Sequence, residues 1–596
     1  MCGIIGYVGN GDAVKKIIRG LKFLEYRGYD SSGLAIISNG KISIRKKEGR
    51  VKTLENCLIS APIIGHTAIG HTRWATHGAP SDNNAHPFVS NDGNFAVVHN
   101  GIIENYLILK DFLAEKGFVF YSQTDSEVIS NLIQFCFKED SESAILEAVG
   151  YLKGSYAIGI VSSAEPDKIF AVKKDNPLIA ATNGNEGFIC SDMIGLGNTV
   201  KEAVILNNCT VSVITRDTIT VKSFSGKQIN PIFVPVCCDD SCLPYEYECF
   251  MRKEIDEIPN AIKRAIDGYV PVPDELTDGI KRICFIGCGT ALHAGMSAKY
   301  LLRRLLPDID AYSEPSSEFI YTDYPVYDTL TIAISQSGET ADTLLAIRKI
   351  KDRGGKVIAV CNVPTSTLVH ESDFTIFTDA GPEIAVASTK AYNCQNAVLT
   401  RFCLDLSHKF HGISDFLYKS YIKNLYSLCL YASKTLCCEK DIADFAKNNY
   451  TAKSVFYIGR GLDYFTACEG SLKLKEISYI HSEAYAGGEL KHGTLALIEK
   501  GVIVVAIITQ SENADKMYAN LLEVKSRGAK IVTITPFKNK NISFVSDYIV
   551  YIPQIDDILY HIISVIPTQF IAYYIALAKG CDIDKPRNLA KSVTVE

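Results

Sequence analysis

Residues 331–364, TIAISQSGETADTLLAIRKIKDRGGKVIAVCNVP, decide the fold class of most of the chain. An apolar run is followed by a turn rich in Ser and Thr, a stretch with helical periodicity and a second apolar run. Strands and helices that alternate in this order form β-α-β units with parallel strands. The segment therefore predicts a doubly wound α/β sheet.

A second copy of this pattern lies at residues 504–536, VVAIITQSENADKMYANLLEVKSRGAKIVTITP. An earlier strand and Gly-rich turn, RICFIGCGTALHAG at 282–295, likewise resembles SVFYIGRGLDYFTA at 454–467. The copies are offset by about 172 residues, a period far longer than that of solenoid repeats. We therefore expect two duplicated domains.

The rest of the chain has a different pattern. Up to about residue 225, short apolar runs alternate with Gly, Asn and Asp turns, and helical stretches lie near 12–26 and 125–152, which predicts sheets with helices packed on them. Three prolines and no sustained periodicity then indicate a linker. The expected organisation is a layered α+β domain, a linker, two parallel-sheet domains and a tail, at 1–225, 226–250, 251–415, 416–580 and 581–596.

Composition excludes several classes of protein. The 596 residues carry a net charge of only −6, so we expect no nucleic-acid or membrane-surface partner. The absence of a signal-peptide pattern and the irregular spread of 19 cysteines favour a reducing cytoplasm. The apolar stretch 561–580 is interrupted by Pro567 and Gln569, which favours a buried helix over a membrane span. One local group of cysteines lacks the paired spacing of a zinc site, so no metal is expected there: Cys237, Cys238, Cys242 and Cys249.

The turn SQSGET at 335–340 is the first candidate binding site. Ligands of open α/β sheets bind at the carboxyl ends of strands, where this turn leads into a helix. Its side-chain donors and the first backbone N–H groups of the helix suit a phosphate, although an ordinary helix cap has a similar composition. The donors are Ser335, Gln336, Ser337 and Thr340. The second copy lacks the Gly and Thr, so the ligand is expected in the first, and neither Gly-x-Gly turn completes a dinucleotide fingerprint, so no nicotinamide cofactor is expected.

Two further regions carry charged groups of undecided role. Residues 469–494 concentrate acidic and basic side chains, with Glu469, Lys473 and Glu476 on one helical face, a spacing that is also typical of a solvated, salt-bridged surface. Lys591 has no charged neighbour before the terminus. A lysine there either belongs to an inert tail or forms a Schiff base with a carbonyl substrate.

Cys2 is the candidate nucleophile of the amino-terminal domain. Removal of the initiator Met would make it the first residue, with an α-amine able to act as base for its own thiol. An oxyanion hole and a substrate clamp would still be needed, and HTRWATHG (71–78) and HNG (99–101) offer candidates. Arg73 could hold a carboxylate with two hydrogen bonds.

These motifs resemble a known family. CGIIGYVG, HTRWATHG, HNGIIENY and QTDSEVI resemble the glutaminase domain of N-terminal-nucleophile (Ntn) amidotransferases, and SQSGETADTL, EIAVASTKAY and EGSLKLKEISYIHSEAYAGGELKHG resemble sugar isomerase (SIS) domains. From end to end the chain is similar to the isomerising glutamine–fructose-6-phosphate aminotransferases, or glucosamine-6-phosphate synthases. The resemblance implies conversion of fructose 6-phosphate and L-glutamine to glucosamine 6-phosphate and L-glutamate, the first step of the hexosamine (UDP-N-acetylglucosamine) pathway, without a cofactor.

The resemblance also implies roles in the glutaminase half. Cys2 would attack the glutamine amide, and Asn100 with Gly101 would stabilise the oxyanion. The residues expected to bind glutamine are Arg73 for its carboxylate, Asp125 for its amino group, and Thr76 and His77 in the same pocket. Trp74, the only tryptophan, would gate a shielded passage for ammonia.

In the isomerase half the resemblance assigns Ser335, Gln336, Ser337 and Thr340 to the phosphate, and Thr290, Val386 and Ser388 to the sugar. Lys591 would form an imine at C2, Glu476 would move a proton between C1 and C2, and Lys473 would stabilise the developing charge. His492 would assist ring opening from a neighbouring subunit, which implies at least a homodimer.

Two positions depart from the family pattern: Ala291 stands where Ser is common and Thr494 where Pro is common. Among alternatives, an amidophosphoribosyltransferase would use paired acidic residues such as Asp239 and Asp240, but no suitable phosphate loop follows them. The SGGxDS loop of asparagine synthetase is absent. A non-catalytic sugar-phosphate sensor would need neither Lys591 nor a glutaminase half.

Overall fold

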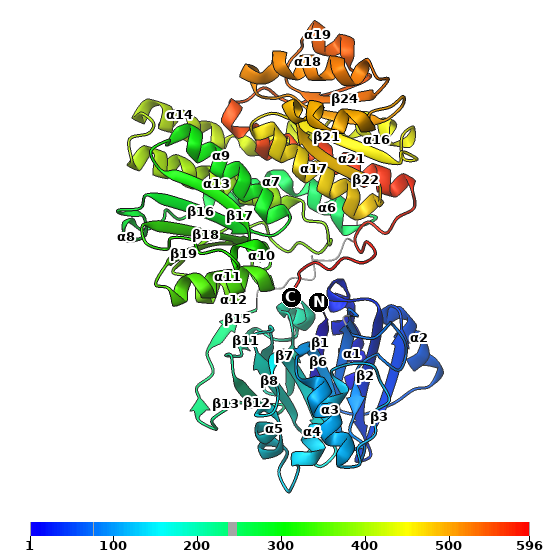
Figure 1. Ribbon diagram of the computed structural model, residues 1–596. Helices are drawn as coiled ribbons and strands as arrows, with labels where there is room; N and C mark the ends of the chain where they lie inside the picture. The colour runs from blue at the N-terminus through cyan, green and yellow to red at the C-terminus, as the bar shows by residue number, and fades with distance from the viewer. Residues whose placement is uncertain (1, 76, 237–246, 595–596) are drawn as a thin grey trace. The chain divides into compact units, whose positions relative to one another are not determined.

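The computed structural model describes residues 2–75, 77–236 and 247–594, which belong to two compact units. The first unit comprises residues 1–243 and 590–596, and the second comprises residues 244–589. Each unit has its own sheets and its own cores (Figure 1).

Two antiparallel sheets form the first unit. The larger has the order β15-β11-β9-β10-β1-β4-β2-β3 and the smaller β14-β13-β12-β8-β7-β6-β5. The strands of the larger sheet are β1 (Gly3–Gly9), β2 (Ser31–Ser38), β3 (Lys41–Glu48), β4 (Thr67–Arg73), β9 (Ile179–Thr182), β10 (Glu186–Cys190), β11 (Glu202–Ile205) and β15 (Phe233–Pro235). Those of the smaller are β5 (Phe88–Val89), β6 (Phe95–Ile103), β7 (Gly154–Ser162), β8 (Ile169–Lys174), β12 (Thr210–Ile214), β13 (Ile219–Ser223) and β14 (Gln228–Ile229).

The two sheets pack face to face, with helices on their outer faces. Ile4 and Ile69 of the larger sheet share a core with Val98 and Ala157 of the smaller. The outer faces are covered by α1 (Ala13–Leu24) and α2 (Val51–Ser60) on the larger sheet and by α3 (Tyr106–Glu115), α4 (Glu127–Cys136) and α5 (Ser141–Val149) on the smaller. This helix–sheet–sheet–helix order is the layered architecture that the turn-rich pattern predicts.

The segment predicted as a linker contains ordered strands. Residues 228–229 form β14 beside β13, and residues 233–235 form β15 at the edge of the larger sheet beside β11. Residues 237–246, which include Cys237, Cys238, Cys242, Asp239 and Asp240, lie outside the described residues.

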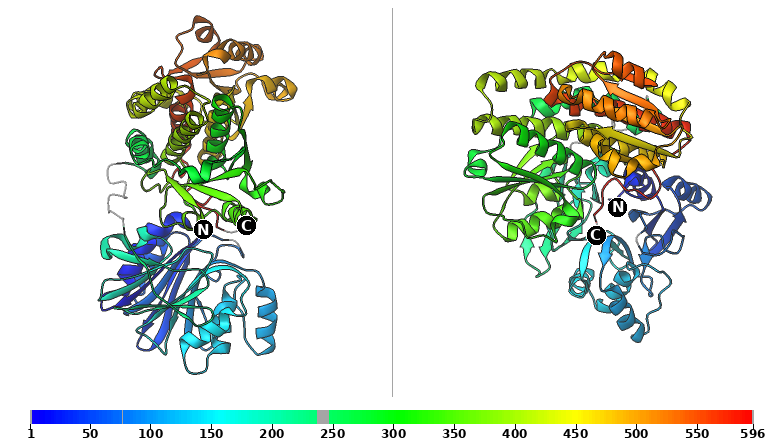
Figure 2. Two further views of the ribbon diagram at one scale, coloured as in Figure 1. Left: turned by 90° about the vertical axis from the view of Figure 1, so that its left-hand side faces the viewer. Right: turned by 45° about the horizontal axis from the view of Figure 1, so that its top comes forward.

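Two five-stranded parallel sheets form the second unit, with helices on both faces (Figure 2). Their orders, β17-β16-β18-β19-β20 and β22-β21-β23-β24-β25, are the same, which confirms the duplication inferred from the repeat. The first copy contains β16 (Arg282–Gly287), β17 (Asp310–Pro315), β18 (Thr329–Ser335), β19 (Lys356–Cys361) and β20 (Phe374–Phe377), and the second contains β21 (Ser454–Gly459), β22 (His481–Ala486), β23 (Ile503–Ile507), β24 (Lys530–Thr535) and β25 (Tyr548–Tyr551).

Helices join the two copies through one shared core. The helices of the first copy are α6 (Phe250–Asp256), α7 (Ile258–Asp267), α8 (Asp274–Thr277), α9 (Thr290–Leu305), α10 (Ser316–Phe319), α11 (Ala341–Asp352), α12 (Thr367–Glu371) and α13 (Lys390–Lys409). Those that follow are α14 (Asp415–Tyr426), α15 (Leu428–Leu436), α16 (Glu439–Lys447), α17 (Leu462–Ser478), α18 (Ala514–Lys525), α19 (Lys540–Val545), α20 (Tyr560–Ile563) and α21 (Val565–Ala578). Helix α9 of the first copy packs against α17 of the second, so the boundary between the copies runs between these two helices.

The apolar stretch near the carboxyl end is a core element. Residues 557–578 are long and apolar enough to cross a membrane, but 83% of the most apolar window is buried inside the protein. Helix α21 packs along α17 in the shared core. The interruption by Pro567 and Gln569 therefore marks a buried helix, as the sequence predicts.

Candidate active sites

The Cys2 thiol lies directly before β1, a strand whose seven residues are all buried. The backbone N–H of Trp74 donates to Cys2 Sγ at 3.2 Å, and the thiol donates to the Trp74 carbonyl oxygen at 3.6 Å. Burial raises the pKa of the Cys2 thiol, while the charges of Arg73 and Arg27 lower it. The Trp74 N–H and the two guanidinium charges thus oppose the effect of burial on the pKa of this thiol, which remains raised overall.

The Asn100 side chain is held from both sides. Its Nδ2 donates to the Cys2 carbonyl oxygen at 3.0 Å, and its Oδ1 lies 3.0 Å from Nε2 of His71. That Nε2 is also 3.0 Å from the His99 carbonyl oxygen, which can only accept, so Nε2 carries the proton. Asn100 must therefore present its oxygen to His71 and its N–H donors to the Cys2 side.

Gly101 follows Asn100 in β6 and has a φ of +126°. A Cβ at this position would lie 2.0 Å from the Ser155 carbonyl oxygen, so only glycine lets β6 and β7 approach here. The glycine thereby fixes the course of the strand that carries Asn100.

A buried cation and a carboxylate belong to the same site. Arg73, the last residue of β4, is 3% exposed, and its Nη2 donates to the carbonyl oxygens of His77 and, at 3.1 Å, of Gly78. Its Nη1 is buried without a hydrogen-bond partner among the described residues. Asp125 accepts from the Ile103 N–H at 2.8 Å and acts electrostatically on Arg73. An unpaired guanidinium N–H and a carboxylate beside a thiol suit an α-amino acid.

The loop after β4 carries the other residues that were predicted to bind the substrate glutamine. The Trp74 ring packs edge-on against Tyr29 with centroids 5.5 Å apart, and the His77 ring packs edge-on against Tyr106 at 5.6 Å. Thr76 lies outside the described residues.

The predicted phosphate loop connects β18 with α11 in the second unit. Ser335 Oγ lies 3.1 Å from Thr340 Oγ1 and accepts from the Gly338 N–H at 3.0 Å, while Ser337 Oγ accepts from the Glu339 N–H at 3.2 Å. Gly338 has a φ of +67°, and a Cβ there would meet Ser366 Oγ at 2.1 Å. Gln336 and Ser337 are half-buried at the mouth of this turn. These donors surround the start of α11, which is the geometry of an anion site.

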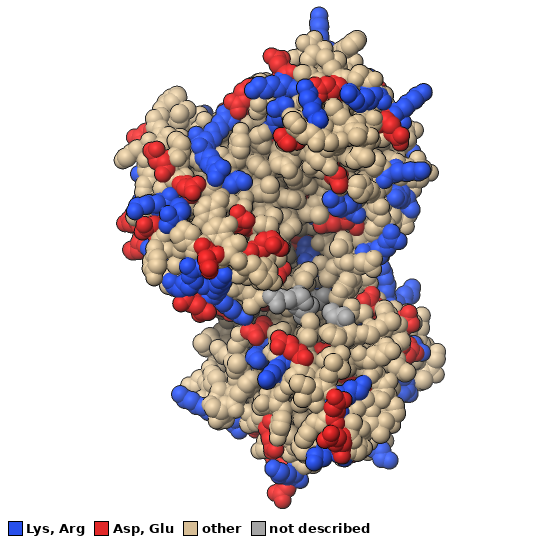
Figure 3. Space-filling view, viewed as in Figure 1, with Lys and Arg blue, Asp and Glu red and all other residues tan. Residues whose placement is uncertain are grey.

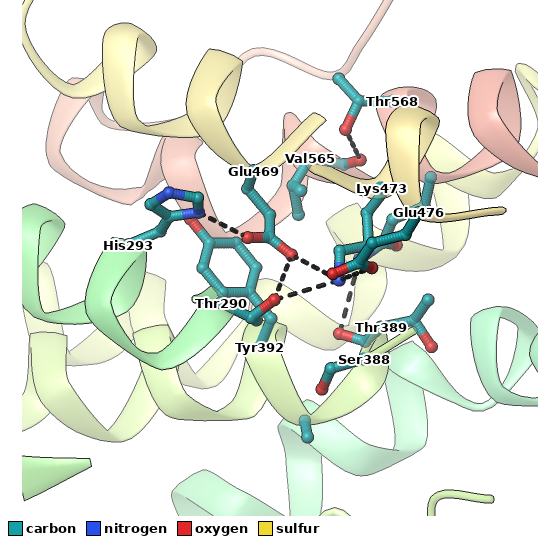
Figure 4. A network of polar contacts seen from close by, with 12 residues as sticks. Thr290, His293, Ser388, Thr389, Tyr392, Glu469, Lys473, Glu476, Val565 and Thr568 are labelled. Carbon is teal, nitrogen blue, oxygen red and sulfur yellow. Dashed lines mark hydrogen bonds and ion pairs between the residues drawn. The ribbon is translucent and has the colours of Figure 1, made fainter. Parts of the chain in front are cut away.

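A buried network crosses the boundary between the two copies (Figure 4). Glu469 on α17 is 0% exposed and accepts from Thr290 Oγ1 at 3.0 Å. Its other oxygen lies 2.8 Å from His293 Nδ1. Lys473 Nζ donates to Thr290 Oγ1 at 3.0 Å and to Glu476 Oε2 at 2.7 Å, and lies 3.4 Å from Glu469. The face predicted from the i, i+4, i+7 spacing is thus paired, with Glu469 and Lys473 buried and Glu476 half-buried.

Charge balance keeps this network ionised. Burial alone lowers the pKa of Lys473, but the carboxylates of Glu476 and Glu469 raise it above its ordinary value. Burial alone raises the pKa of Glu469, but Lys473 and a hydrogen bond from His293 hold it below its ordinary value. An ammonium 2.7 Å from a half-buried carboxylate can support proton transfer by that carboxylate.

Ser388 and Val386 lie on the segment before α13. Ser388 Oγ donates to Glu383 Oε2 at 2.7 Å, and the N–H groups of Thr389 and Ala391 donate to Oε1 of the same carboxylate at 2.9 and 3.0 Å. The Val386 N–H donates to the Asp584 carbonyl oxygen at 2.9 Å. The Asp584 carboxylate in turn accepts from the first N–H groups of α6.

His492 and Lys591 are the remaining predicted residues of the isomerase half. His492 is exposed at the end of a short 3₁₀ helix, η4 (Gly487–His492), and Thr494 is buried just beyond it. Lys591 is half-buried in the segment 590–596 that belongs to the first unit.

Three positioning groups were missed in the sequence: His71, His293 and Glu383. His71 is the first residue of the HTRWATHG motif, which also contains Arg73, but nothing in the sequence distinguishes a functional histidine in a strand from a structural one. His293 lies one turn after the Gly-rich turn and meets Glu469 only because α9 packs on α17. Glu383 opens the EIAVASTKAY motif, where its carboxylate could have been noticed as a partner for the loop N–H groups.

Family models match both halves of the chain. A model described as a SIS domain matches residues 279–404 and 450–579, and one described as a glutamine amidotransferase domain matches residues 71–196. The two SIS matches fall on the two parallel sheets.

Curated relatives match from end to end. The chain is 45% identical to the glutamine–fructose-6-phosphate aminotransferase (isomerizing) of Clostridium acetobutylicum, covering 100% of both chains. The enzymes of the same name from Thermococcus kodakarensis and Aquifex aeolicus are 42% and 38% identical, also over 100% of both chains. Among solved structures, the C-terminal domain of glucosamine-fructose-6-phosphate aminotransferase from Francisella tularensis matches with a TM-score of 0.55 and 37% identity, covering 58% of this chain and 100% of that chain.

Proposed function

The chain belongs to the family of isomerising glutamine–fructose-6-phosphate aminotransferases, and on that premise we propose which of its residues carry out each step. The protein converts fructose 6-phosphate and L-glutamine to glucosamine 6-phosphate and L-glutamate. This is the first step of the hexosamine pathway.

We propose that Cys2 Sγ attacks the side-chain carbonyl carbon of glutamine. Asn100 Nδ2 and the Gly101 N–H stabilise the resulting oxyanion, which then collapses to a thioester and expels ammonia. Water hydrolyses the thioester to glutamate and the free thiol. The free Nη1 of Arg73 supports binding of the glutamine α-carboxylate, and Asp125 supports binding of its amino group. Trp74, Thr76 and His77 complete the pocket.

In the second unit, the turn between β18 and α11 binds the phosphate through Ser335, Gln336, Ser337 and Thr340. Thr290, Val386 and Ser388 contact the sugar. Glu383 supports this assignment, because its carboxylate fixes Ser388 and the start of α13.

Lys591 condenses with the C2 carbonyl of the open-chain ketose to give an imine and water. Ammonia then displaces the lysine amine, leaving a fructose imine. Glu476 removes a proton from C1, and return of a proton to C2 gives glucosamine 6-phosphate. Lys473 stabilises the negative charge that develops between these steps, and His492 assists ring opening.

The ion pair between buried Lys473 and half-buried Glu476 carries this proposal. Lys473 is 1% exposed and held charged by two carboxylates, a costly arrangement for a residue without a binding or catalytic task. Incubation with glutamine and fructose 6-phosphate should release glutamate and glucosamine 6-phosphate in equal amounts. Glutamate without glucosamine 6-phosphate would refute the assignment.

We also propose a cytoplasmic homodimer or larger homo-oligomer. An exposed His492 fits a site completed by a neighbouring subunit. The face shown in Figure 3 carries Lys and Arg interspersed with Asp and Glu, which supports the expectation of no nucleic-acid or membrane partner. Sedimentation of the purified protein tests the oligomer, and a monomer at micromolar concentration would contradict it.

A further inference from the structure

Asp463 occupies an unexpected position in the second parallel-sheet domain. Its side chain is 2% exposed in the first turn of α17 and reaches the loop after β23. The N–H of Thr509 donates to Asp463 Oδ2 at 2.8 Å, and the N–H of Gln510 donates to the same oxygen at 3.3 Å. The Thr509 hydroxyl donates to Oδ1. The carboxylate therefore accepts two loop N–H groups and one hydroxyl.

This loop is the counterpart of the phosphate loop in the first domain. Strand β23 has the same place in its sheet as β18, and α18 follows it as α11 follows β18. The first copy offers SQSGET between strand and helix, and the second offers TQSEN. Both loops thus present N–H and hydroxyl donors at the carboxyl ends of parallel strands.

Asp463 itself is the counterpart of Ala291. Each lies four residues after the glycine that ends the first strand of its domain. That glycine is Gly287 of β16 for Ala291 and Gly459 of β21 for Asp463. The same close approach supports the match: a Cβ on Gly287 would lie 3.0 Å from the Ala291 backbone, and one on Gly459 would lie 2.4 Å from the Asp463 backbone. The first domain thus has a methyl group where the second has a carboxylate.

We propose that Asp463 is a built-in substitute for a phosphate group, which fills the anion cradle of the second domain and leaves each chain with one sugar-phosphate site. A carboxylate and a phosphate accept the same kinds of hydrogen bond, and a carboxylate in the first turn of α17 also benefits from the helix dipole. In the first domain, Ala291 supplies no carboxylate at the corresponding position, so its side chain cannot occupy the loop donors in this way. This inference rests on the phosphate role proposed for Ser335, Ser337 and Thr340.

Other groups around the second cradle are consistent with a closed site. The Ser511 hydroxyl donates to the Asp557 carboxylate at 2.8 Å, and Gln510 Nε2 donates to the Asp557 carbonyl oxygen at 3.0 Å. Two donors of the loop are thereby engaged by one neighbouring residue.

Equilibrium dialysis of the full chain against labelled inorganic phosphate tests the inference. The unaltered protein should bind one phosphate per chain, and Asp463→Gly, which exposes the loop N–H groups, should bind two. Asp463→Asn is the matched control, because its amide fills the same space, and it should still bind one. A folded Asp463→Gly protein that binds one phosphate, or an unaltered protein that binds two, would overturn the inference. An unaltered protein that binds none would instead refute the phosphate role of the first loop.

The reciprocal substitution tests the same idea without altering the second domain. Ala291→Asp places a carboxylate in the first cradle and should weaken binding of fructose 6-phosphate about 100-fold or more, because like charges placed together cost several kcal/mol. Ala291→Ser, which adds no charge, should keep binding within about threefold. Glutamine hydrolysis reports that the Ala291→Asp protein is folded in the first unit, and a cooperative thermal transition reports on the second. Unchanged fructose 6-phosphate binding by Ala291→Asp would contradict the inference.

Discussion

His71 donates its Nε2 proton to Asn100 Oδ1 at 3.0 Å, and this contact decides which way the Asn100 amide faces. Burial lowers the pKa of His71 to about 3, so the ring is neutral and keeps a single proton. It stacks on His86 with centroids 4.0 Å apart, which fixes its plane. A neutral donor whose ring plane is fixed thus holds the Asn100 amide, the proposed oxyanion donor, toward Cys2.

Replacing His71 with leucine should therefore lower kcat for glutamine hydrolysis by about 10- to 100-fold, somewhat less than the loss of an oxyanion donor itself. The KM for glutamine should change little, because Arg73 and Asp125 are untouched. His71→Gln supplies an N–H at a similar reach and should recover most of the activity. Steady-state glutaminase kinetics check this, with exposed His66→Gln as control. Equal rates for the leucine and glutamine variants would show that His71 does not orient Asn100.

The proposed imine places Lys591 in the sugar reaction alone. Lys591→Ala should abolish glucosamine 6-phosphate formation while retaining some glutamine hydrolysis. Borohydride reduction in the presence of fructose 6-phosphate should leave a covalent sugar adduct on the unaltered chain and none on the variant, as seen by intact-mass measurement. Lys579→Ala, at an exposed position just after α21, is the control. Retained synthesis would remove Lys591 from the mechanism.

The sequence predicts the parts of the fold in which strands and helices alternate regularly or repeat. It does not predict the role of a side chain whose partners are brought to it by tertiary packing. The duplicated β-α-β pattern predicts both parallel sheets and places Ser335 at a strand end. The role of Glu469 could not be predicted, because its spacing is also that of a solvated face. Its burial results from α9, whose Thr290 and His293 stand 179 and 176 residues away in the chain.

Strand length sets a second limit on what the sequence predicts. Strands β14 and β15 have two and three residues, too few for an alternation to be recognised. Nearby prolines therefore suggested a linker where the chain still pairs with both sheets of the first unit. The role of His71 could not be predicted either, because its contact with Asn100 joins strands β4 and β6 of different sheets.

Buried neutral histidines should make the protein sensitive to acid. Burial lowers the pKa of both His71 and His561 to about 3. Since their unfolded value is about 6.5, the unfolded chain takes up protons first, and stability present above pH 6.5 should fall between pH 6.5 and 3, by up to about 1.4 kcal/mol per pH unit for each histidine. His561→Gln should show a shallower decline of Tm below pH 6.5. Exposed His411→Gln is the control, and an unchanged slope for His561→Gln would contradict this account.

Glu476 is the proposed base, so Glu476→Gln should reduce glucosamine 6-phosphate formation by about 10²- to 10⁴-fold, the usual contribution of general acid–base catalysis. Fructose 6-phosphate binding and glutamine hydrolysis should persist, because neither uses this carboxylate. Product assay with paired measurement of glutamate separates the two reactions. Exposed Glu499→Gln is the control, and a proportional loss of both products would indicate general damage instead.

Glu469 should act differently from Glu476, because it touches Lys473 and Thr290 from the buried side of the network. Glu469→Gln keeps the shape but removes one of the two carboxylates that raise the pKa of Lys473. If Lys473 works as an ammonium, the decline of isomerisation at high pH should begin at lower pH in the variant, with a smaller loss of kcat at neutral pH than in Glu476→Gln. A purely structural role would lower activity at all pH values alike, so an unshifted pH profile would show that Glu469 only supports packing.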